Sequence, residues 1–339
     1  MRFHGQPTPG SGFDAFPWRP TAWNQAWAGL ALDGMESGLT MAKLTLGPLL
    51  FNWPVEAQRD FYFRIADEAP VDVVYLGEVV CSKRAAAFAP HIPEVAERLA
   101  QAGKEVVHST LALVMTAREC AAIRDAAADP ELRLEANDIA AAALLAGRPH
   151  VIGPFVNVYN EGTVRYLAEN GATRIALPNE LPATAIGVLA GAVDGVEIEV
   201  QAFGRLPLAI SARCYHARAH GLHKDGCQYV CEEDRDGMAV ETLDGDPFLA
   251  VNGTQTLSHA YCSLVHELTP LVGMGVDCFR LWPHDLDMVA VAQTFREVLD
   301  GREDADAAAA SLARLVPGVT FANGFYHGRE GAAAILARH

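Results

Sequence analysis

From residue 41 onward, short β-rich blocks alternate with amphipathic helical segments, and this alternation restricts the fold more than any other feature of the sequence. Two of the helical segments, "PEVAERLAQAG" (93–103) and "EGTVRYLAENGA" (161–172), are each stopped by a glycine, Gly103 and Gly171. Strand–helix alternation predicts parallel strands joined by crossover helices. The predicted strands are 43–49, 71–77, 104–110, 132–137, 150–156, 173–178, 196–204, 206–211, 247–253 and 277–283.

The number of strand–helix units decides between two α/β architectures. About eight units close a barrel, whereas fewer leave an open doubly wound sheet. No GxGxxG sequence follows a predicted strand, so an open dinucleotide-binding sheet has no support. We therefore predict a TIM-barrel-like (β/α) barrel, whose regularity the sequence leaves open, as a single domain over residues 41–339.

Residues 1–40 differ from the rest of the chain. They are rich in proline, glycine and tryptophan without a clear period, and we interpret them as an extension that is disordered or results from a mis-assigned start codon. The sequence shows no secretory signal pattern and no apolar run long enough to cross a bilayer, so we expect no transmembrane segment and a cytoplasmic location. The formal net charge of −16 opposes direct binding of nucleic acid, because an acidic surface repels phosphate.

Polar residues follow several predicted strands, and in a parallel barrel these positions meet at the carboxyl-terminal rim, where active sites lie. Each residue alone is more often a helix cap or a turn residue than a ligand contact. Together they predict a polar mouth suited to a small, oxygen-rich molecule. The candidate catalytic or binding residues are Glu78, Asn137, Asn157 and Glu180.

The chain has seven cysteines, and this odd number argues against a disulfide framework. We expect thiols that are reduced or bound to metal. Cys120, Cys262 and Cys278 lie in alanine-rich or apolar segments, and we interpret them as core residues.

The other four cysteines follow a different pattern. Cys81 and Cys214 each follow a predicted strand at the same end of the barrel, and Cys227 and Cys231 share one face if their segment is helical. Barrel closure brings loops that are distant in sequence together, so the four thiolates can converge. Such a set fits an iron–sulfur cluster or a structural zinc ion, and four unrelated thiols remain an alternative.

Three histidines, His216, His220 and His223, lie in the same polar segment, "ARCYHARAHGLHKDGCQYVC" (212–231). The dispersed cysteine spacing is less typical of zinc, whose structural sites usually use closely spaced pairs. A zinc site of three cysteines and one histidine nevertheless stays open, as does a solvated loop in which the histidines bind nothing.

Several segments resemble the UbiU/UbiV branch of the collagenase-like peptidase family over roughly residues 41–335. The most specific part is "YLGEVVCSKR" (75–84) together with the cysteine triplet at 214–231. Weaker signals are "EANDIAA" (135–141), "GPFVNVYNEGT" (153–163) and "ALPNELP" (176–182). Residues 1–40 lie outside the family pattern.

The resemblance implies a barrel-like fold and a 4Fe–4S cluster whose ligands are Cys81, Cys214, Cys227 and Cys231. It also implies a role in oxygen-independent ubiquinone biosynthesis, as a subunit of an O2-independent ring hydroxylase. The implied partners are a UbiU-type homologue, which forms a heterodimer with the chain, and a lipid-binding companion. The implied oxygen donor for the aromatic ring of the quinone precursor is a small molecule such as prephenate.

Three other functions stay open. A collagenase-like peptidase, which the family name suggests, lacks a recognisable nucleophile–base pair or an HExxH zinc motif in this sequence. An accessory role in RNA hydroxylation is opposed by the negative charge, unless a partner holds the RNA. The third is a zinc-bound scaffold whose partner performs the chemistry.

Overall fold

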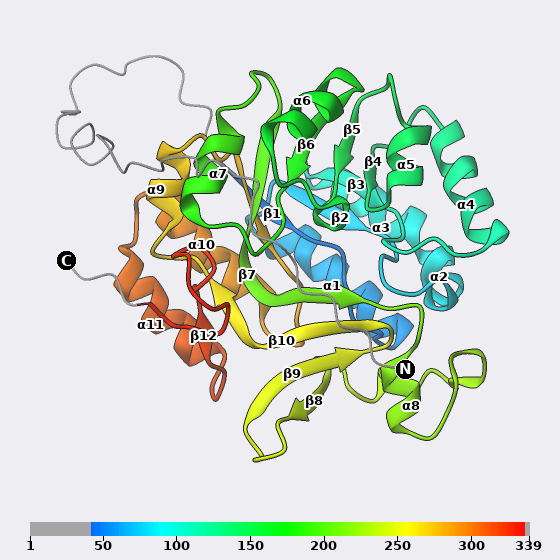
Figure 1. Cartoon of the computed structure of the whole chain (residues 1–339). Helices are drawn as coiled ribbons and strands as arrows, with labels where there is room; N and C mark the ends of the chain where they lie inside the picture. Colours follow the sequence, from blue (N-terminus) through cyan, green and yellow to red (C-terminus); the bar gives the residue numbers. More distant parts are fainter. Residues whose placement is uncertain (1–41, 336–339) are drawn as a thin grey trace, which may run out of the picture. The chain divides into compact units, whose positions relative to one another are not determined.

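Eight parallel strands close into a barrel at the centre of the protein. The computed structural model describes residues 42–335, and there the pairing order β1–β2–β3–β4–β5–β6–β7–β11 returns to β1 (Figure 1). The barrel strands are β1 (Lys43–Leu46), β2 (Val73–Leu76), β3 (Glu105–Ser109), β4 (Leu134–Ala136), β5 (His150–Ile152), β6 (Ala172–Ala176), β7 (Glu197–Ile210) and β11 (Cys278–Leu281). This closure confirms the predicted (β/α) barrel. The interpretation of residues 1–40 lies outside the described residues.

Helices connect the strands and cover the outside of the barrel, as crossover connections between parallel strands require. The α-helices of the first six units, with two helices after β2, are α1 (Val55–Glu68), α2 (Ser82–Phe88), α3 (Ile92–Gln101), α4 (Ala117–Ala128), α5 (Ile139–Leu144), α6 (Glu161–Glu169) and α7 (Ala183–Ala190). The chain continues after β11 with α10 (Met288–Leu299) and α11 (Ala305–Leu315). Short 3-10 helices, η1 (Ala89–His91) and η2 (Pro154–Val156), join α2 to α3 and β5 to α6.

Polar side chains begin several of these helices. The Asn160 carboxamide oxygen accepts a hydrogen bond from the Thr163 backbone amide at 2.9 Å, and Thr116 and Glu119 form a reciprocal capping box at the start of α4. Such caps satisfy backbone donors that the first helical turn leaves unpaired, and each stabilises its helix by about 1 kcal/mol.

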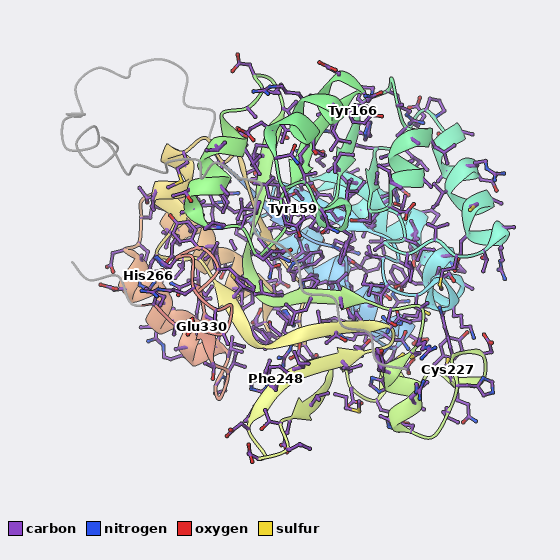
Figure 2. All side chains as sticks on the ribbon, in the orientation of Figure 1. Tyr159, Tyr166, Cys227, Phe248, His266 and Glu330 are labelled. Carbon is purple, nitrogen blue, oxygen red and sulfur yellow. The ribbon has the colours of Figure 1, made fainter. Side chains whose placement is uncertain are left out.

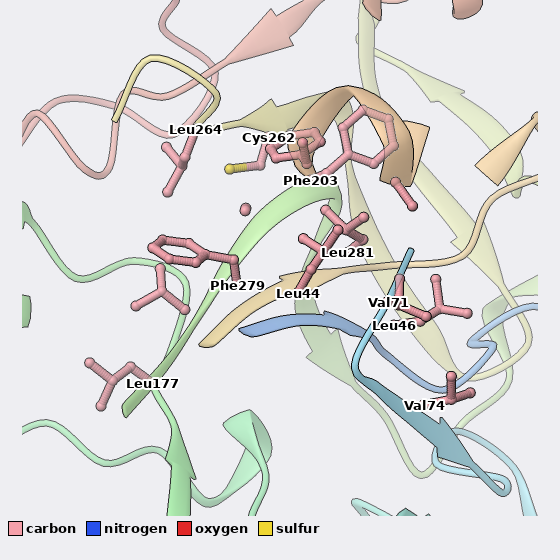
Figure 3. Packing of buried hydrophobic residues seen from close by; sticks show 14 of the residues in the cluster. Leu44, Leu46, Val71, Val74, Leu177, Phe203, Cys262, Leu264, Phe279 and Leu281 are labelled. Atoms are coloured by element: carbon pink, nitrogen blue, oxygen red, sulfur yellow. The ribbon is translucent and has the colours of Figure 1, made fainter. Parts of the chain in front are cut away.

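Strand side chains alternate between two separate cores. On β2, Val74 and Leu76 pack outward into the large apolar core shared with the helices, whereas Val73 and Tyr75 point into the barrel interior. Figure 3 shows part of the outer core, where Leu44 lies close to Leu281. Successive strand residues face opposite sides, so a strand that is buried on both sides has a continuous run of apolar residues. The sequence VVYL of β2 is such a run.

The three cysteines interpreted as core residues differ in exposure. Cys262 and Cys278 are buried, and Cys262 lies beside Phe203 in the outer core (Figure 3). Cys120 lies on α4 as expected but is only half-buried. Leucine-sized side chains in such cores each contribute about 1.5–3 kcal/mol relative to exposure.

A long insertion separates β7 from β11 and interrupts the regular barrel. It contains α8 (Tyr215–Ala219), η3 (Lys224–Gly226), η4 (Val230–Glu232), β8 (Met238–Glu241), β9 (Pro247–Asn252), β10 (Gln255–Ser263) and α9 (Leu268–Gly273). The second half of β7 leaves the barrel and pairs antiparallel with β10, which continues to β9 and β8. In Figure 1, β8, β9 and β10 lie below the barrel, and α8 lies to their right.

The predicted break between strands 196–204 and 206–211 is wrong, because β7 runs through both. Gly204, at φ +107°, marks the place where β7 leaves the barrel, and a Cβ atom there would lie 2.6 Å from Nε2 of His284. Pro207, which lacks an amide donor, lies where the pairing with β10 shifts register. Sequence analysis missed β8, β10 and β12 (Phe321–Ala322), which are short or polar on one face.

Among residues 42–335, no helix combines the length and the apolar character that crossing a bilayer requires. The longest described helix, α1, has 14 residues.

Candidate metal centre at the barrel rim

The structure brings Cys81, Cys214, Cys227 and Cys231 together around one pocket. Cys81 follows β2 and precedes α2, Cys214 follows β7 and precedes α8, and the other two lie on the loop after α8. All four line a hollow with an empty volume of about 350 Å³, part of which is open to solvent. Figure 2 labels Cys227 on this loop, next to α8.

The segment of Cys227 and Cys231 is not an α-helix, so the condition for placing them on one helical face is not met. Cys227 ends η3, and Cys231 lies in η4. Between them, Gln228 and Tyr229 have positive φ angles of 50° and 56°. Two consecutive left-handed residues reverse the chain locally, and this reversal brings both cysteines to the same pocket.

Two side chains fix the loop that carries Cys81: Glu78 from the loop itself, and Thr254 from the turn between β9 and β10. The Glu78 carboxylate accepts hydrogen bonds from the backbone amides of Val80 and Cys81, both at 2.8 Å. Burial raises the pKa of Glu78, although Arg84 and these two amides act in the opposite direction. The Thr254 hydroxyl donates to the Val80 carbonyl at 2.9 Å. Glu78 therefore positions Cys81.

Arg84 lies beneath the pocket and joins its three chain segments. Its guanidinium is buried and donates to the Leu50 carbonyl at 3.0 Å and to Oδ1 of Asn252 at 2.7 Å. Asn252 in turn donates through Nδ2 to the carbonyls of Cys231 and Asp234, both at 2.8 Å. Nε of Arg84 has no hydrogen-bond partner in the described structure. A buried, partly unpaired cation beside thiols favours a negatively charged occupant.

Gly253 makes room for this guanidinium. A Cβ atom at this position would lie 2.1 Å from Nη2 of Arg84, and the backbone has φ +67°. The Gly253 carbonyl accepts a hydrogen bond from the Cys214 thiol at 3.2 Å. Both the positive φ and the close approach of Arg84 require glycine.

Burial raises the pKa of the Cys81 and Cys231 thiols, and Arg84 acts against this rise in both. Cys214 and Cys227 raise the pKa of Cys231 further, because neighbouring thiolates repel each other. Four closely placed thiolates therefore need positive charge between them. Metal binding supplies that charge and deprotonates the thiols.

The spacing of the sulfur atoms bears on whether the four cysteines could hold a single zinc ion or an iron–sulfur cluster. Zinc–sulfur bonds of about 2.3 Å in a tetrahedron place sulfur atoms about 3.8 Å apart. Over residues 42–335, no three cysteine sulfur atoms lie within 4.8 Å of one another, and no cysteine joins a histidine in such a group. The four thiols line one pocket without forming such a compact group, and four cysteines are also the usual ligands of an iron–sulfur cluster.

Two of the predicted rim residues share a second pocket. Asn157 and Glu180 line a hollow of about 1,070 Å³ empty volume, partly open to solvent, beside the outer half of β7. Both are exposed, and Asn157 has a left-handed backbone at φ 63°. The Tyr159 hydroxyl donates to the Glu180 carboxylate; burial and this carboxylate together raise the pKa of Tyr159 to about 12.

The other two predicted rim residues lie elsewhere. Glu78 positions the Cys81 loop, as described above. Asn137 is buried, and its Nδ2 donates to the Thr110 carbonyl and to Oε2 of Glu135 at 3.2 and 2.9 Å. The four candidates therefore do not form one site.

Sequence analysis did not anticipate a charged cluster in the barrel interior. Nη2 of Arg280 on β11 lies 2.6 Å from Glu199 on β7 and 2.8 Å from Glu135 on β4, and all three side chains are buried. The guanidinium carbon lies 4.0 Å from the ring centroid of Tyr75, whose hydroxyl donates to Glu199 at 2.8 Å. Burial acts to raise the pKa of Glu199, but Arg280 and Arg174 outweigh it and lower that pKa.

A second ionic cluster joins the insertion to the barrel. Asp236, just before β8, accepts from Nδ1 of His284 at 2.6 Å and from Nη2 of Arg205 at 3.0 Å, and the Tyr261 hydroxyl also donates to it. Burial acts to raise the pKa of Asp236, but His284 and Arg205 outweigh it and lower the pKa to about 2. Nε2 of His284 accepts from the Arg205 backbone amide at 3.0 Å.

Arg84 and Gly253 line the cysteine pocket, and neither they nor the nearby Asp234 were singled out from the sequence. Arg84 lies within the quoted segment "YLGEVVCSKR", but nothing local distinguishes it from a solvated arginine. Its burial depends on residues from β9 and from the loop after β1.

Dihydrodipicolinate synthase from Aquifex aeolicus, a solved structure, is 12% identical over 81% of each chain with a TM-score of 0.28, and a score that low says nothing about what this chain does. The family model described as peptidase family U32 matches residues 61–335, which include the barrel from α1 onward and all four pocket cysteines. The chain belongs to peptidase family U32.

Proposed function

We propose that the chain is a UbiV-type iron–sulfur subunit that acts in the oxygen-independent hydroxylation of a quinone precursor. Its partners in this proposal are a UbiU-type homologue, with which it forms a heterodimer, and a lipid-binding companion. The observation that carries the proposal is the convergence of Cys81, Cys214, Cys227 and Cys231 on one pocket. Membership in peptidase family U32 is consistent with it but does not select this function.

A 4Fe–4S cluster held by four cysteines transfers single electrons at a potential set by hydrogen bonds, charge and burial. This chain's residues supply those terms: Arg84 places a buried positive charge next to Cys81 and Cys231, and the Glu78 carboxylate fixes the Cys81 backbone. Four cysteine ligands leave no iron position free for a substrate. The pocket therefore serves electron relay or structure, and substrate binds elsewhere.

The second pocket is the proposed place for the small oxygen donor, such as prephenate. Asn157, Asn179 and Glu180 contribute polar groups to its wall. Of the candidate residues, Glu180 is exposed there and interacts with Tyr159. Replacing Glu180 by alanine is expected to reduce anaerobic ring hydroxylation without changing iron content, and unchanged hydroxylation would remove this residue from the proposal.

The insertion also exposes large apolar side chains that a partner subunit could cover. Tyr215 and Tyr229 lie next to the cysteine pocket, and Phe248 on β9 is 58% exposed (Figure 2). Aromatic residues exposed in this way are enriched at protein interfaces. They support the proposal that a partner docks on the insertion, close to the cluster.

The first test is the iron and acid-labile sulfide content of anaerobically purified protein. We expect about four irons and four sulfides per chain. Replacing any one of the four pocket cysteines by alanine is expected to abolish most of this content, whereas Cys120→Ala, which changes a half-buried cysteine on α4, leaves it intact. One zinc per chain without sulfide would contradict the proposal.

The second test addresses the reaction. Quinones extracted from a deletion strain grown without oxygen are expected to lack the ring hydroxylation, and the wild-type chain restores it while Cys81→Ala does not. Unchanged quinones in the deletion strain would refute the assigned pathway even if the cluster is present.

Peptidase activity, the alternative that the family name suggests, gains no support from the arrangement of side chains. At the barrel rim, His284 pairs with the half-buried Asp236, and its second ring nitrogen already accepts from the Arg205 backbone amide. That histidine has no free nitrogen with which to activate a nucleophile. A casein digestion assay on purified protein is expected to show no cleavage.

A further inference from the structure

His216 lies on α8 and His220 is the residue that ends this helix, and their rings are oriented alike. His216 and His220 are four residues apart, and their rings stack at a centroid distance of 5.2 Å with an interplanar angle of 3°. Nδ1 of His216 lies 3.2 Å from the Val251 carbonyl, and Nδ1 of His220 lies 3.1 Å from the His216 carbonyl. A carbonyl oxygen only accepts, so Nδ1 carries the hydrogen in both rings, and in the neutral form of each ring Nε2 presents its lone pair. This tautomer is the one that metal-binding histidines adopt when a carbonyl holds their other nitrogen.

A carboxylate faces the lone pair of His216. Oδ2 of Asp234 lies 3.0 Å from Nε2 of His216, which is fully buried and has no hydrogen-bond partner in the described structure. The short distance without a hydrogen bond means that the carboxylate oxygen lies off the axis of the ring nitrogen. A hydrogen bond needs the acceptor near that axis. If a tetrahedral metal ion lay on the axis of Nε2, its next ligand would lie to one side of that axis, as the Asp234 oxygen does.

Neighbouring residues hold the three groups in place. The Asp234 backbone carbonyl accepts from Nδ2 of Asn252, and the Gly237 amide also donates to it. His216 is fixed against β9 through Val251. One ring nitrogen from each histidine and one carboxylate oxygen of Asp234 lie within 4.8 Å of one another, and ligand atoms around zinc lie about 3.3 Å apart. His220 is exposed, so a small rotation of its side chain closes the remaining gap.

We propose that Nε2 of His216, Nε2 of His220 and Oδ2 of Asp234 bind one divalent transition-metal ion, Zn²⁺, with a fourth position open to water. Two imidazoles and one carboxylate suit zinc, whereas magnesium and calcium prefer all-oxygen sites. This site uses none of the pocket cysteines, although it lies on the same insertion as three of them. The ion ties α8, which begins after Cys214, to the loop after Cys231.

The test measures zinc, iron and acid-labile sulfide together on the full chain, purified anaerobically, equilibrated with ZnCl2 and desalted. The variants are His220→Ala, which changes an exposed side chain, and Asp234→Asn, which keeps the shape of the side chain. His91→Ala is the matched control, because His91 also lies beside a carboxylate, Glu94, at 2.7 Å on a distant helix. Cys81→Ser reports on zinc that binds to the cysteines.

We expect one zinc per chain in the wild type, in His91→Ala and in Cys81→Ser, and an affinity at least 10-fold weaker in His220→Ala and Asp234→Asn. Iron and sulfide are expected to stay at wild-type values in His220→Ala. Zinc absent from the wild type, zinc retained by both site variants, or zinc lost in Cys81→Ser but kept in His220→Ala would each overturn the proposal. Because iron and zinc are measured separately, failure of this site and failure of the iron–sulfur proposal are distinguishable.

Replacing zinc by Co²⁺ gives an independent signature. We expect a visible cobalt spectrum without thiolate-to-metal charge-transfer absorption in the wild type, and loss of that spectrum in His220→Ala. Strong charge-transfer absorption that persists in His220→Ala would place the ion on the cysteines and contradict the proposed ligands.

Discussion

The barrel interior and the cysteine pocket both gather ionisable groups, but they satisfy them in opposite ways. Inside the barrel, Arg280 lies between the carboxylates of Glu199 and Glu135 and over the ring of Tyr75, so charge is matched within the chain. At the rim, Cys214 is the one pocket cysteine in the described structure whose thiol donates a hydrogen bond. Within the described residues, the interior pairs its charges inside the chain, although Nε and Nη1 of Arg280 have no hydrogen-bond partner, whereas at the rim four thiols face one another around a pocket.

This difference separates what holds the fold together from what serves function. A buried ion pair that loses one partner costs much more stability than an exposed pair, because a charge remains in a low-dielectric surrounding. Protonated thiols without hydrogen-bond partners reduce the stability of the fold only slightly. When they bind a metal as thiolates, they stabilise it. Changes in the interior should therefore affect stability, and changes at the rim should affect metal content.

The largest expected effect follows from breaking the interior cluster. Arg280→Met leaves Glu199 and Glu135 buried without their cation, and we expect the free energy of unfolding to fall by about 3–5 kcal/mol. Urea denaturation measures the change, and iron content per folded chain should stay constant. Arg302→Met, at an exposed arginine paired with Glu297, is the control and should leave the urea midpoint nearly unchanged. Equal midpoints in the two variants would contradict the distinction between interior and surface.

An intermediate effect is expected at the rim, where metal content should change more than stability. Gly253→Ala forces an L-residue into φ +67° and moves Arg84, because the new Cβ would lie 2.1 Å from Nη2. We expect a loss of about 1–2 kcal/mol from the backbone conformation and a severe loss of bound iron.

Gly245→Ala is the matched control for this variant. Gly245 has φ +86° with no atom within 4 Å of a new Cβ, so it reports the backbone strain alone. Denaturation and iron analysis of both variants separate the two contributions. Wild-type iron content in Gly253→Ala would show that Arg84 does not need its present position.

The third effect concerns the ionic cluster between insertion and barrel, and it depends on pH. The pKa of Asp236 is about 2 in the folded protein and about 3.9 in an unfolded chain. Because folding lowers this pKa, its contribution to stability is full above pH 4 and is lost as the pH falls towards 2. The contribution is about 2 kcal/mol.

Asp236→Asn tests this contribution. We expect the stability difference between wild type and variant to shrink by about 2 kcal/mol between pH 5 and pH 2, as followed by denaturation at each pH. Asp244→Asn, at an exposed turn residue, should show no such dependence. A constant difference over this range would mean that the salt bridges of Asp236 do not stabilise the fold.

Part of the candidate site could be predicted from the sequence because it depends on local order. Cys81 and Cys214 each follow an apolar strand, and a parallel barrel brings such positions to one rim. The condition for placing Cys227 and Cys231 on one helical face is not met, because left-handed residues at 228 and 229 interrupt the segment. The polar residues predicted at the rim do not form one site. Glu78 accepts from a backbone amide of the Cys81 loop, and Asn137 donates to Glu135 in the barrel interior.

The sequence by itself determined the strand–helix alternation, and with it the barrel, because hydrophobic periodicity is a local property of consecutive residues. It also indicated the cysteines and histidines of residues 212–231 as candidate metal ligands, but not Asp234. Only the tertiary structure decided that Arg84 lies beneath the thiols and that Asp234 faces His216, because these contacts depend on how the insertion folds back on the barrel. Burial and pairing arise between residues distant in sequence, and no local pattern encodes them.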